Sequence, residues 1–360
     1  MYTLFLIDTL VLLTLTLLPL ARAEHWWIRS LDFPRLQLVS LAALLLILEA
    51  LLLNPSETAV QMLLLAALFC VIYQSWWIFP YTSAAPLEAA NAELNTSAPS
   101  FKILTANVLA SNRNSAGLLE LVRGANPDLL LTLESNDWWQ QQLDVLEADY
   151  PYTVKCPQEN LYGMHVYSRL KLSGSEIKFL LEDDIPSIHT AIHLREGLRI
   201  GAHFVHPRPP APPESDRSSP RDAELVIVGK SVAQDRGPII VAGDLNDVAW
   251  SRTTRLFRKV SGLLDPRVGR GMFNTFHAQH WYLRWPLDHL FHSGHFAVKE
   301  IRLLPEFGSD HFAFFSELVY QGDNEDSDRG LEPDQDDIVQ AEEKVKDENV
   351  STADVPTPER

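Results

Sequence analysis

The chain reads Pro-Ile-Ile-Val-Ala-Gly-Asp-Leu-Asn between residues 238 and 246, and the fold assignment starts from this stretch. A short apolar run rich in β-branched residues, bounded by proline and glycine, is typical of a buried β-strand. Two polar residues, Asp244 and Asn246, follow the run directly. We therefore predict a core strand that delivers a carboxylate and an amide to one edge of a sheet.

The segments on either side of this strand repeat the pattern between residues 101 and 320. Short apolar runs predict strands at 102–107, 128–134, 163–168, 190–194, 199–206, 238–243, 287–291 and 312–319. Between them, amphipathic stretches that begin at a serine or an aspartate predict helices at 115–124, 137–148, 219–234 and 251–260. This alternation predicts an α/β domain whose sheets are covered on the outside by helices.

Three apolar runs precede this domain, at residues 4–20, 36–53 and 59–79. Each approaches the roughly 20 helical residues that cross about 30 Å of hydrocarbon, so we predict two or three transmembrane helices within residues 1–80. The first run contains Asp8 and ends in Ala-Arg-Ala at 21–23, which resembles a signal-peptidase site. Because its first ten residues hold no lysine or arginine, we interpret it as a retained helix.

The flanks of these runs predict a multi-pass protein of the cell membrane, bound to the lipid bilayer through its N-terminal helices. Tryptophan pairs at 26–27 and 76–77 are typical of membrane–water interfaces. Three arginines between residues 21 and 35 would place that loop, and with it the following domain, in the cytoplasm. No lysine or arginine occurs from 80 to 100, however, so the side that the domain faces stays open. We interpret residues 81–100 as a linker.

The net charge of −17 is concentrated at the C-terminus. Residues 321–360 hold 14 Asp or Glu against 4 Lys or Arg, so this tail carries 10 of the 17 negative charges. An acidic segment with few apolar residues predicts a disordered tail. The rest of the chain is only slightly acidic, which argues against a basic nucleic-acid-binding face. No protein partner can be inferred.

Polar residues fall at the ends of the predicted strands in the 101–320 domain. A single acid in such a position is most often a turn residue or a helix cap. Six such positions in one domain are harder to explain in that way, and they predict a functional site. The positions are those of Asn107, Glu134, His206, Asp244, Asp288 and the pair Asp310-His311.

The oxygen atoms among these side chains suit Mg²⁺ or Mn²⁺, which prefer carboxylate and amide ligands and keep several waters. We predict a metal site formed by Asn107, Glu134 and Asp310. Zinc is disfavoured, because the 12 histidines show no tight ligand spacing. The sequence also lacks a Walker loop, a G-x-S-x-G elbow and an H-E-x-x-H motif.

The remaining polar residues predict hydrolysis of a phosphate ester. Asp244 is a candidate to take a proton from the attacking water. Asn246 and His206 are candidates to contact the substrate phosphate. Asp288 is our candidate to hold His311 in one tautomer and to raise its pKa, which suits a histidine that carries positive charge toward a phosphoanion.

These residues, in this order, resemble the endonuclease/exonuclease/phosphatase family, whose members include pancreatic deoxyribonuclease, neutral sphingomyelinases and inositol polyphosphate 5-phosphatases. The resemblance covers residues 101–320. It rests on the first strand ending at Asn107, Pro-Asp through Glu134, Gly-Asp-Leu-Asn at 243–246, Leu-Asp-His-Leu-Phe at 287–291 and Ser-Asp-His at 309–311. The motif Leu-Asp-His-Leu-Phe departs from the family pattern, because His289 stands where a tyrosine is usual.

The resemblance implies a two-sheet α/β sandwich with the site at one edge between the sheets. It also implies metal contacts for Glu134 and Asp310, a catalytic His311 backed by Asp288, and phosphate contacts for His206 and Asn246. His-Pro-Arg-Pro-Pro at 206–210 and Trp-Ser at 250–251 are similar to bacterial members that carry two or three N-terminal membrane helices.

The substrate is not fixed by these motifs, because family members cleave different phosphate esters with one kind of metal centre. We expect a membrane-anchored phosphodiesterase or phosphatase, with a small or lipid-derived substrate favoured over nucleic acid. A metal-dependent nuclease acting on DNA or RNA is one alternative. The other, from a different class, is a non-catalytic membrane-anchored binding protein with the same fold.

Overall fold

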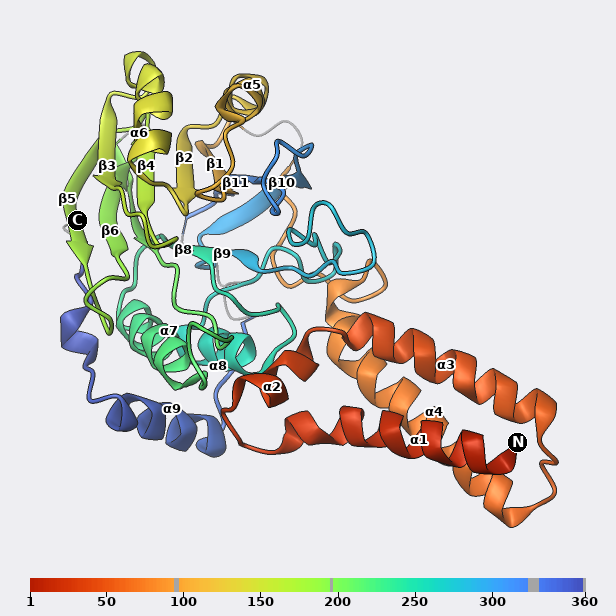
Figure 1. The fold of residues 1–360 in the computed structure, drawn as a ribbon. Coiled ribbons are helices and arrows are strands. Elements are labelled where there is room, and N and C mark those ends of the chain that lie inside the picture. Colours follow the sequence, from red (N-terminus) through yellow and green to blue (C-terminus); the bar gives the residue numbers. More distant parts are fainter. Residues whose placement is uncertain (94–96, 195–196, 323–329, 359–360) are drawn as a thin grey trace.

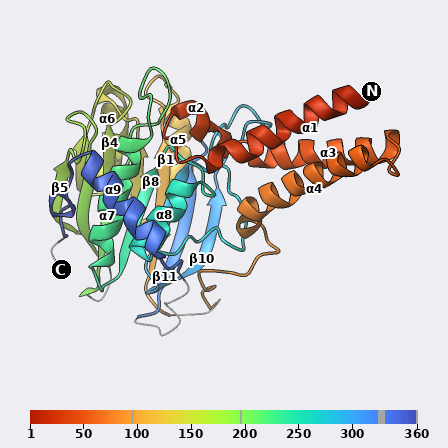
Figure 2. The ribbon, with the colours of Figure 1, turned by 90° about the horizontal axis from the view of Figure 1, so that it is seen from below.

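The computed structural model describes residues 1–93, 97–194, 197–322 and 330–358. At the N-terminus, three long helices run side by side away from the rest of the chain: α1 (Tyr2–Leu17), α3 (Arg35–Leu52) and α4 (Thr58–Ile78) (Figures 1 and 2). We call them the N-terminal bundle. All three are long and apolar enough to cross a membrane. The short helix α2 (Trp26–Arg29) lies where the bundle meets the domain.

Two mixed sheets form the centre of the domain. The first has the order β10-β11-β1-β2-β4-β3 and the second the order β5-β6-β7-β8-β9. Strands β1 and β2 are parallel, as are β7 and β8, and the other neighbours are antiparallel. The strand bounds are β1 Ser100–Asn107, β2 Leu129–Leu133, β3 Tyr152–Cys156, β4 Met164–Ser168, β5 Leu172–Lys178, β6 Ser187–His193, β7 Arg199–Phe204, β8 Ile239–Asp244, β9 Asp288–His292, β10 Phe296–Leu303 and β11 Phe314–Tyr320.

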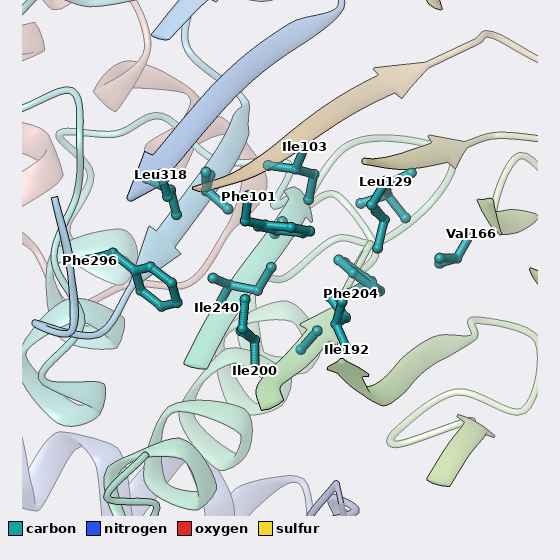
Figure 3. Packing of buried hydrophobic residues seen from close by; sticks show 14 of the residues in the cluster. Phe101, Ile103, Leu129, Val166, Ile192, Ile200, Phe204, Ile240, Phe296 and Leu318 are labelled. Carbon is teal, nitrogen blue, oxygen red and sulfur yellow. The ribbon is translucent and has the colours of Figure 1, made fainter. Parts of the chain in front are cut away.

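The main core lies between the two sheets. Phe101 and Leu129 from the first sheet meet Phe204 and Ile240 from the second, and all four are fully buried (Figure 3). Burying a side chain of this size contributes about 1.5–3 kcal/mol relative to leaving it in water. The predicted sandwich of two sheets is therefore confirmed, and its closure depends on the apolar faces of the central strands.

Helices cover the outer face of each sheet, as predicted. Helices α5 (Ser115–Ala125) and α6 (Asp137–Leu143) pack apolar side chains against the first sheet. Helices α7 (Ser219–Ala233) and α8 (Arg252–Ser261) do the same on the second sheet. The predicted helix 137–148 ends earlier, because its last five residues continue as a 3₁₀-helix.

The predicted linker packs against the domain over part of its length. Glu88 is buried and accepts two hydrogen bonds from the guanidinium of Arg258, at 2.6 and 2.7 Å. Asn91 forms a β-bridge with Val298 of β10. Removing one partner of a buried ion pair typically destabilises a protein by about 3–5 kcal/mol. Residues 85–91 are thus a part of the folded unit, while 94–96 lie outside the described residues.

The prediction of a disordered C-terminal tail does not hold for helix α9 (Gln335–Asp347). This helix packs on α7 and α8 (Figure 2), where its Ala341 is fully buried beside Val226 and Leu256. Lys344 forms ion pairs with Asp222 of α7 at 2.7 Å and with Glu24 at 3.1 Å. The high acidic content led to a prediction of disorder, although this segment forms an amphipathic helix with ion pairs to the domain. Residues 323–329 and 359–360 of the tail lie outside the described residues.

Candidate active site

The sheet topology brings the predicted site residues to one edge of the sandwich. Asn107 ends β1 and Glu134 directly follows the parallel neighbour β2. In the second sheet, Asp244 ends β8 and is the register partner of Asp288, which begins β9. Since β1 and β2 also contact β8, carboxylates from both sheets meet at this edge.

Three residues at this edge have positive φ angles. Glu134 has φ 57° and Asn246 has φ 51°, in the left-handed region that side chains other than glycine rarely adopt. Gly243 has φ +148°, and a Cβ added there would lie 1.9 Å from the carbonyl oxygen of Val205. The close approach of β8 to the end of β7 therefore requires glycine immediately before Asp244.

Glu134 and Asn107 form the centre of the predicted metal site. The Asn107 amide nitrogen donates to Glu134 Oε1 at 2.8 Å and to Asp244 Oδ2 at 3.2 Å. The side-chain amide oxygen of Asn107, Oδ1, is the atom a metal would need, and it accepts from the Leu109 N–H at 3.1 Å. In this arrangement Asn107 orients the carboxylates.

One carboxylate oxygen of this cluster has no partner among the described residues. Glu134 Oε2 is buried and has no hydrogen-bond partner within the part of the chain that the structure describes. Burial raises the pKa of Glu134 to about 7, and the charges on Asp310 and Asp244 act in the same direction. An unpartnered carboxylate oxygen beside two further acids is the donor set that a hard divalent cation stabilises, so the residues fit Mg²⁺ or Mn²⁺.

His311 is buried between two carboxylates. Its Nδ1 lies 2.7 Å from Asp288 Oδ2, and its Nε2 lies 3.6 Å from Asp244 Oδ2. Burial alone would lower the pKa of His311, but Asp288, Asp244 and Asp310 together raise it to about 10. The imidazole is therefore charged at neutral pH, as the predicted pairing with Asp288 requires.

The loop before β11 holds His311 in place. Ser309 Oγ donates to the backbone carbonyl oxygen of Asn107 at 2.8 Å and accepts from the His311 N–H at 3.0 Å. The serine of the Ser-Asp-His motif thereby ties this loop to the end of β1. Asp288 is fixed independently, since its N–H donates to Thr275 Oγ1 at 3.1 Å.

Asp244 connects the histidine to the carboxylate cluster. Burial would raise the pKa of Asp244, but His311 and His206 lower it below its ordinary value, so it is ionised. Ligand atoms of Asp244, Asp288 and His311 lie within 4.8 Å of one another, a spacing that could hold a metal ion. A protonated imidazole cannot bind a metal, however, and the raised pKa of His311 favours a proton-carrying group over a ligand.

His206 is the second histidine near Asp244. Its Nε2 is 4.0 Å from Asp244 Oδ2, and burial lowers the pKa of His206, so the ring is neutral. Its Nδ1 is buried without a hydrogen-bond partner among residues 1–93, 97–194, 197–322 and 330–358. Asn246 Nδ2 donates to the Pro207 carbonyl oxygen at 3.0 Å, which links the loop after β8 to the residue after His206.

Sequence reasoning missed several residues that shape this edge. Tyr162 lies with its ring centroid 5.3 Å from that of His206, and its hydroxyl donates to Glu214 at 2.9 Å. Phe276 packs its ring 5.0 Å from that of His311. Neither residue belongs to a motif, and only the tertiary structure brings them to the site.

Arg221, on α7, supports the turn that carries Asp244 and Asn246. It is buried and donates to the Asn246 carbonyl oxygen at 2.9 Å. Its guanidinium also pairs with Asp222 and Asp247, each at 3.0 Å. Arg221 therefore stabilises the backbone of the Gly-Asp-Leu-Asn turn at 243–246, and its charge is paired with two aspartates.

Known structures share this architecture. Humanized D. rerio TDP2 with 14 mutations is 16% identical over 61% of this chain and 98% of its own, with a TM-score of 0.51. An endonuclease/exonuclease/phosphatase from Beutenbergia cavernae is 17% identical over 62% and 72%, also with a TM-score of 0.51. The human Nocturnin catalytic domain with bound sulfate is 17% identical over 67% of this chain and 99% of its own, with a TM-score of 0.51. The fold is thus a DNase-I-like α/β sandwich.

The family follows from the sequence. Residues 104–311 match the Endonuclease/Exonuclease/phosphatase family. This range is more than half of the chain and runs from β1 to His311, so the protein belongs to this family. No curated protein sequence matches the chain significantly. Family members are typically hydrolases of phosphate esters that use divalent metals, which agrees with the acidic cluster at the strand edge.

Proposed function

We propose that this protein is a membrane-anchored, divalent-metal-dependent hydrolase of phosphate esters. The observation that carries the proposal is the charged His311 held between Asp288 and Asp244, next to the unpartnered carboxylate of Glu134. The N-terminal bundle, with its three long apolar helices, supports the anchoring.

The chemistry follows from the positions of the groups. Glu134 and Asp310 would hold Mg²⁺ or Mn²⁺, with Asn107 orienting Glu134, and the metal would supply charge neutralisation and a more acidic bound water. Asp244 is ionised and takes the proton of the attacking water. The water oxygen bonds to phosphorus as the ester P–O bond on the opposite side breaks.

The histidines and Asn246 act on the phosphate. His311 carries a positive charge toward the phosphoryl oxygens and supplies a proton for the leaving oxygen. His206, neutral and with Nδ1 unpartnered among the described residues, and the half-buried Asn246 contact the non-bridging oxygens.

Hydrolysis by the full-length protein in detergent tests this proposal. The substrates are bis(p-nitrophenyl) phosphate, p-nitrophenyl phosphate and plasmid DNA, each with Mg²⁺, with Mn²⁺ and with chelator. We expect metal-dependent turnover of at least one substrate and a loss of about 100-fold or more in His311→Ala. His193→Ala is the matched control, because His193 pairs with the first residue of β7 and so lies at the end of the strands opposite to Asp244. The proposal would be refuted if wild type and His311→Ala were equally inactive on all substrates with both metals.

A further inference from the structure

The segment from Phe276 to Trp285 forms a hairpin with an apolar tip, which we call the aromatic hairpin. The Phe276 N–H donates to the Trp285 carbonyl oxygen at 3.0 Å, and the His277 N–H to that of Leu283 at 2.9 Å. At the tip, the exposed fractions are 79% for Trp281, 54% for Tyr282 and 37% for Leu283. Three consecutive large apolar side chains that face outward at one point of a domain mark an interaction surface.

The base of the aromatic hairpin belongs to the candidate active site. Phe276 forms an isolated β-bridge with His311, and their ring centroids are 5.0 Å apart. The Ala278 N–H donates to the Asp310 carbonyl oxygen at 2.7 Å. The exposed tip is therefore connected, through a few residues, to the histidine and the acid of the Ser-Asp-His motif.

The other side of the hairpin contacts the N-terminal bundle. Trp285 packs edge-on against Phe33, with ring centroids 5.6 Å apart, and Gln37 Nε2 donates to the Tyr282 carbonyl oxygen at 2.9 Å. Gln37 lies in the first turn of α3, about 3 Å of helix rise from its start. The tip thus lies level with the end of a helix that is long enough to cross a bilayer.

Two further tryptophans are exposed on α2 and near the end of α4. Trp27 of α2 is 47% exposed and Trp76, near the end of α4, is 70% exposed. Tryptophan favours the membrane–water interface, where one part of the ring is apolar and the other is hydrated. Trp27, Trp76 and Trp281 thus lie on three separate elements, which are α2, the last turn of α4 and the aromatic hairpin.

One hydrophobic cluster makes the bundle and the site a single body. It contains Ile78 of α4, Val248 and Trp250 after the Gly-Asp-Leu-Asn turn, and Leu287 beside Asp288. Phe276 and Trp285 of the aromatic hairpin pack against it. The position of the candidate active site relative to the bundle is therefore fixed by packing.

We infer that the aromatic hairpin docks on the lipid bilayer and that the substrate is a phosphodiester of a membrane lipid, held at head-group depth. The inference rests on the proposed function. Attack of water on the lipid phosphorus would break the P–O bond to one of the two alcohols, and that alcohol oxygen would take the proton. A nucleic acid would need clustered cations, whereas the hairpin tip presents apolar rings to the interface.

Fluorescence quenching tests the docking without any need for activity. Full-length protein with Trp281→Cys, in a Cys156→Ser background, carries a polarity-sensitive dye in nanodiscs that contain lipids spin-labelled near the head group. The remaining Cys70 is fully buried in the bundle. Val145→Cys is the matched control, because Val145 is 61% exposed on the 3₁₀-helix after α6, far from the bundle (Figure 1). We expect quenching at 281 and none at 145; equal quenching at both positions would overturn the docking.

Activity in nanodiscs of phosphatidylcholine and phosphatidylglycerol tests the substrate class. The double variant Trp281→Ser/Tyr282→Ser should cleave bis(p-nitrophenyl) phosphate within about twofold of wild type but bilayer lipid about tenfold more slowly. Val145→Ser should match wild type on both. Equal lipid hydrolysis by the double variant and wild type would overturn the role of the hairpin.

The two proposals fail in different ways. Wild-type turnover of the soluble diester or of DNA, with no lipid hydrolysis, would overturn the lipid substrate and leave the hydrolase proposal standing. Inactivity of wild type toward all of these substrates with Mg²⁺ and Mn²⁺ would overturn both the hydrolase and its lipid substrate. The quenching result decides the docking in either case.

Discussion

Replacing Asp288 by asparagine removes one negative charge from His311 with almost no change of shape. The two side chains are buried and 2.7 Å apart, and together with Asp244 and Asp310 the aspartate holds the pKa of His311 at about 10, against 6.5 for an ordinary histidine. That difference of about 3.5 pKa units corresponds to about 5 kcal/mol in favour of the imidazolium. Asp288 is the strongest of the three carboxylate contributors.

The size of the effect follows from Coulomb's law. Two unit charges about 4 Å apart interact by about 4 kcal/mol at an effective dielectric constant of about 20, which is about three pKa units. Asp288→Asn should therefore lower the pKa of His311 from about 10 to about 7. Because an imidazole is charged below its pKa and neutral above it, the variant loses the positive charge as pH rises from about 7 to about 10.

The pH profile of kcat/KM on a soluble phosphodiester measures this shift. We expect the alkaline limb of the profile to move from near pH 10 in wild type to near pH 7 in Asp288→Asn. The two proteins should then differ little at about pH 6 and by about 100-fold at about pH 9. Asp288→Glu, which keeps the charge, should keep the alkaline limb near that of wild type. An equal loss at both pH values would refute a charge-holding role for Asp288.

Two further predictions concern stability, measured by thermal unfolding of the full chain in detergent. Burial raises the pKa of Glu224, on α7, to about 8, so its contribution to stability is present below its unfolded pKa of about 4.5 and is lost as pH rises through about 8. Glu224→Gln should therefore raise Tm at about pH 9 and change it little at about pH 4. The same gain in Tm at both pH values would contradict this prediction. Gly243→Ala should destabilise by about 3 kcal/mol or more, because its Cβ would overlap a carbonyl oxygen. Gly124→Ala, with open space around the added Cβ, should be neutral or stabilising, and a similar Tm for both alanine variants would show that β8 can move.

The sequence predicted the strands in the middle of the sheets and missed three of the four strands at their edges. The unpredicted strands β3, β5 and β10 are edge strands, whereas the fourth edge strand, β9, is fully buried and was predicted. A central strand is covered on both faces and reads as a continuous apolar run, whereas an edge strand such as Leu-Ser-Gly-Ser-Glu-Ile-Lys at 172–178 is half-exposed and mixes polar with apolar residues. Pairing with a neighbour, which is a tertiary property, makes such a segment a strand.

The same distinction applies to the candidate site. The motifs named the polar residues at the strand ends, and the structure brings Asn107, Glu134, Asp244, Asp288 and His311 to one edge. The motifs could not indicate which atom of an amide faces a carboxylate, or which rings lie against a histidine. Those features depend on loops such as the aromatic hairpin, whose position is set by contacts far away in the sequence.

The packing of the bundle on the domain decides how the protein should be studied. A fragment of residues 101–320 would remove Glu88 and leave Arg258 buried without its partner. It would also remove Tyr81, whose hydroxyl donates to the Ala249 carbonyl oxygen at 2.6 Å, and Asp32, whose carbonyl oxygen accepts from Trp250 Nε1 at 2.8 Å. Both contacts reach the segment directly after the Gly-Asp-Leu-Asn turn. Inactivity of such a fragment would therefore report loss of support for Asp244 and Asn246, and only the full chain can test the chemistry of the site.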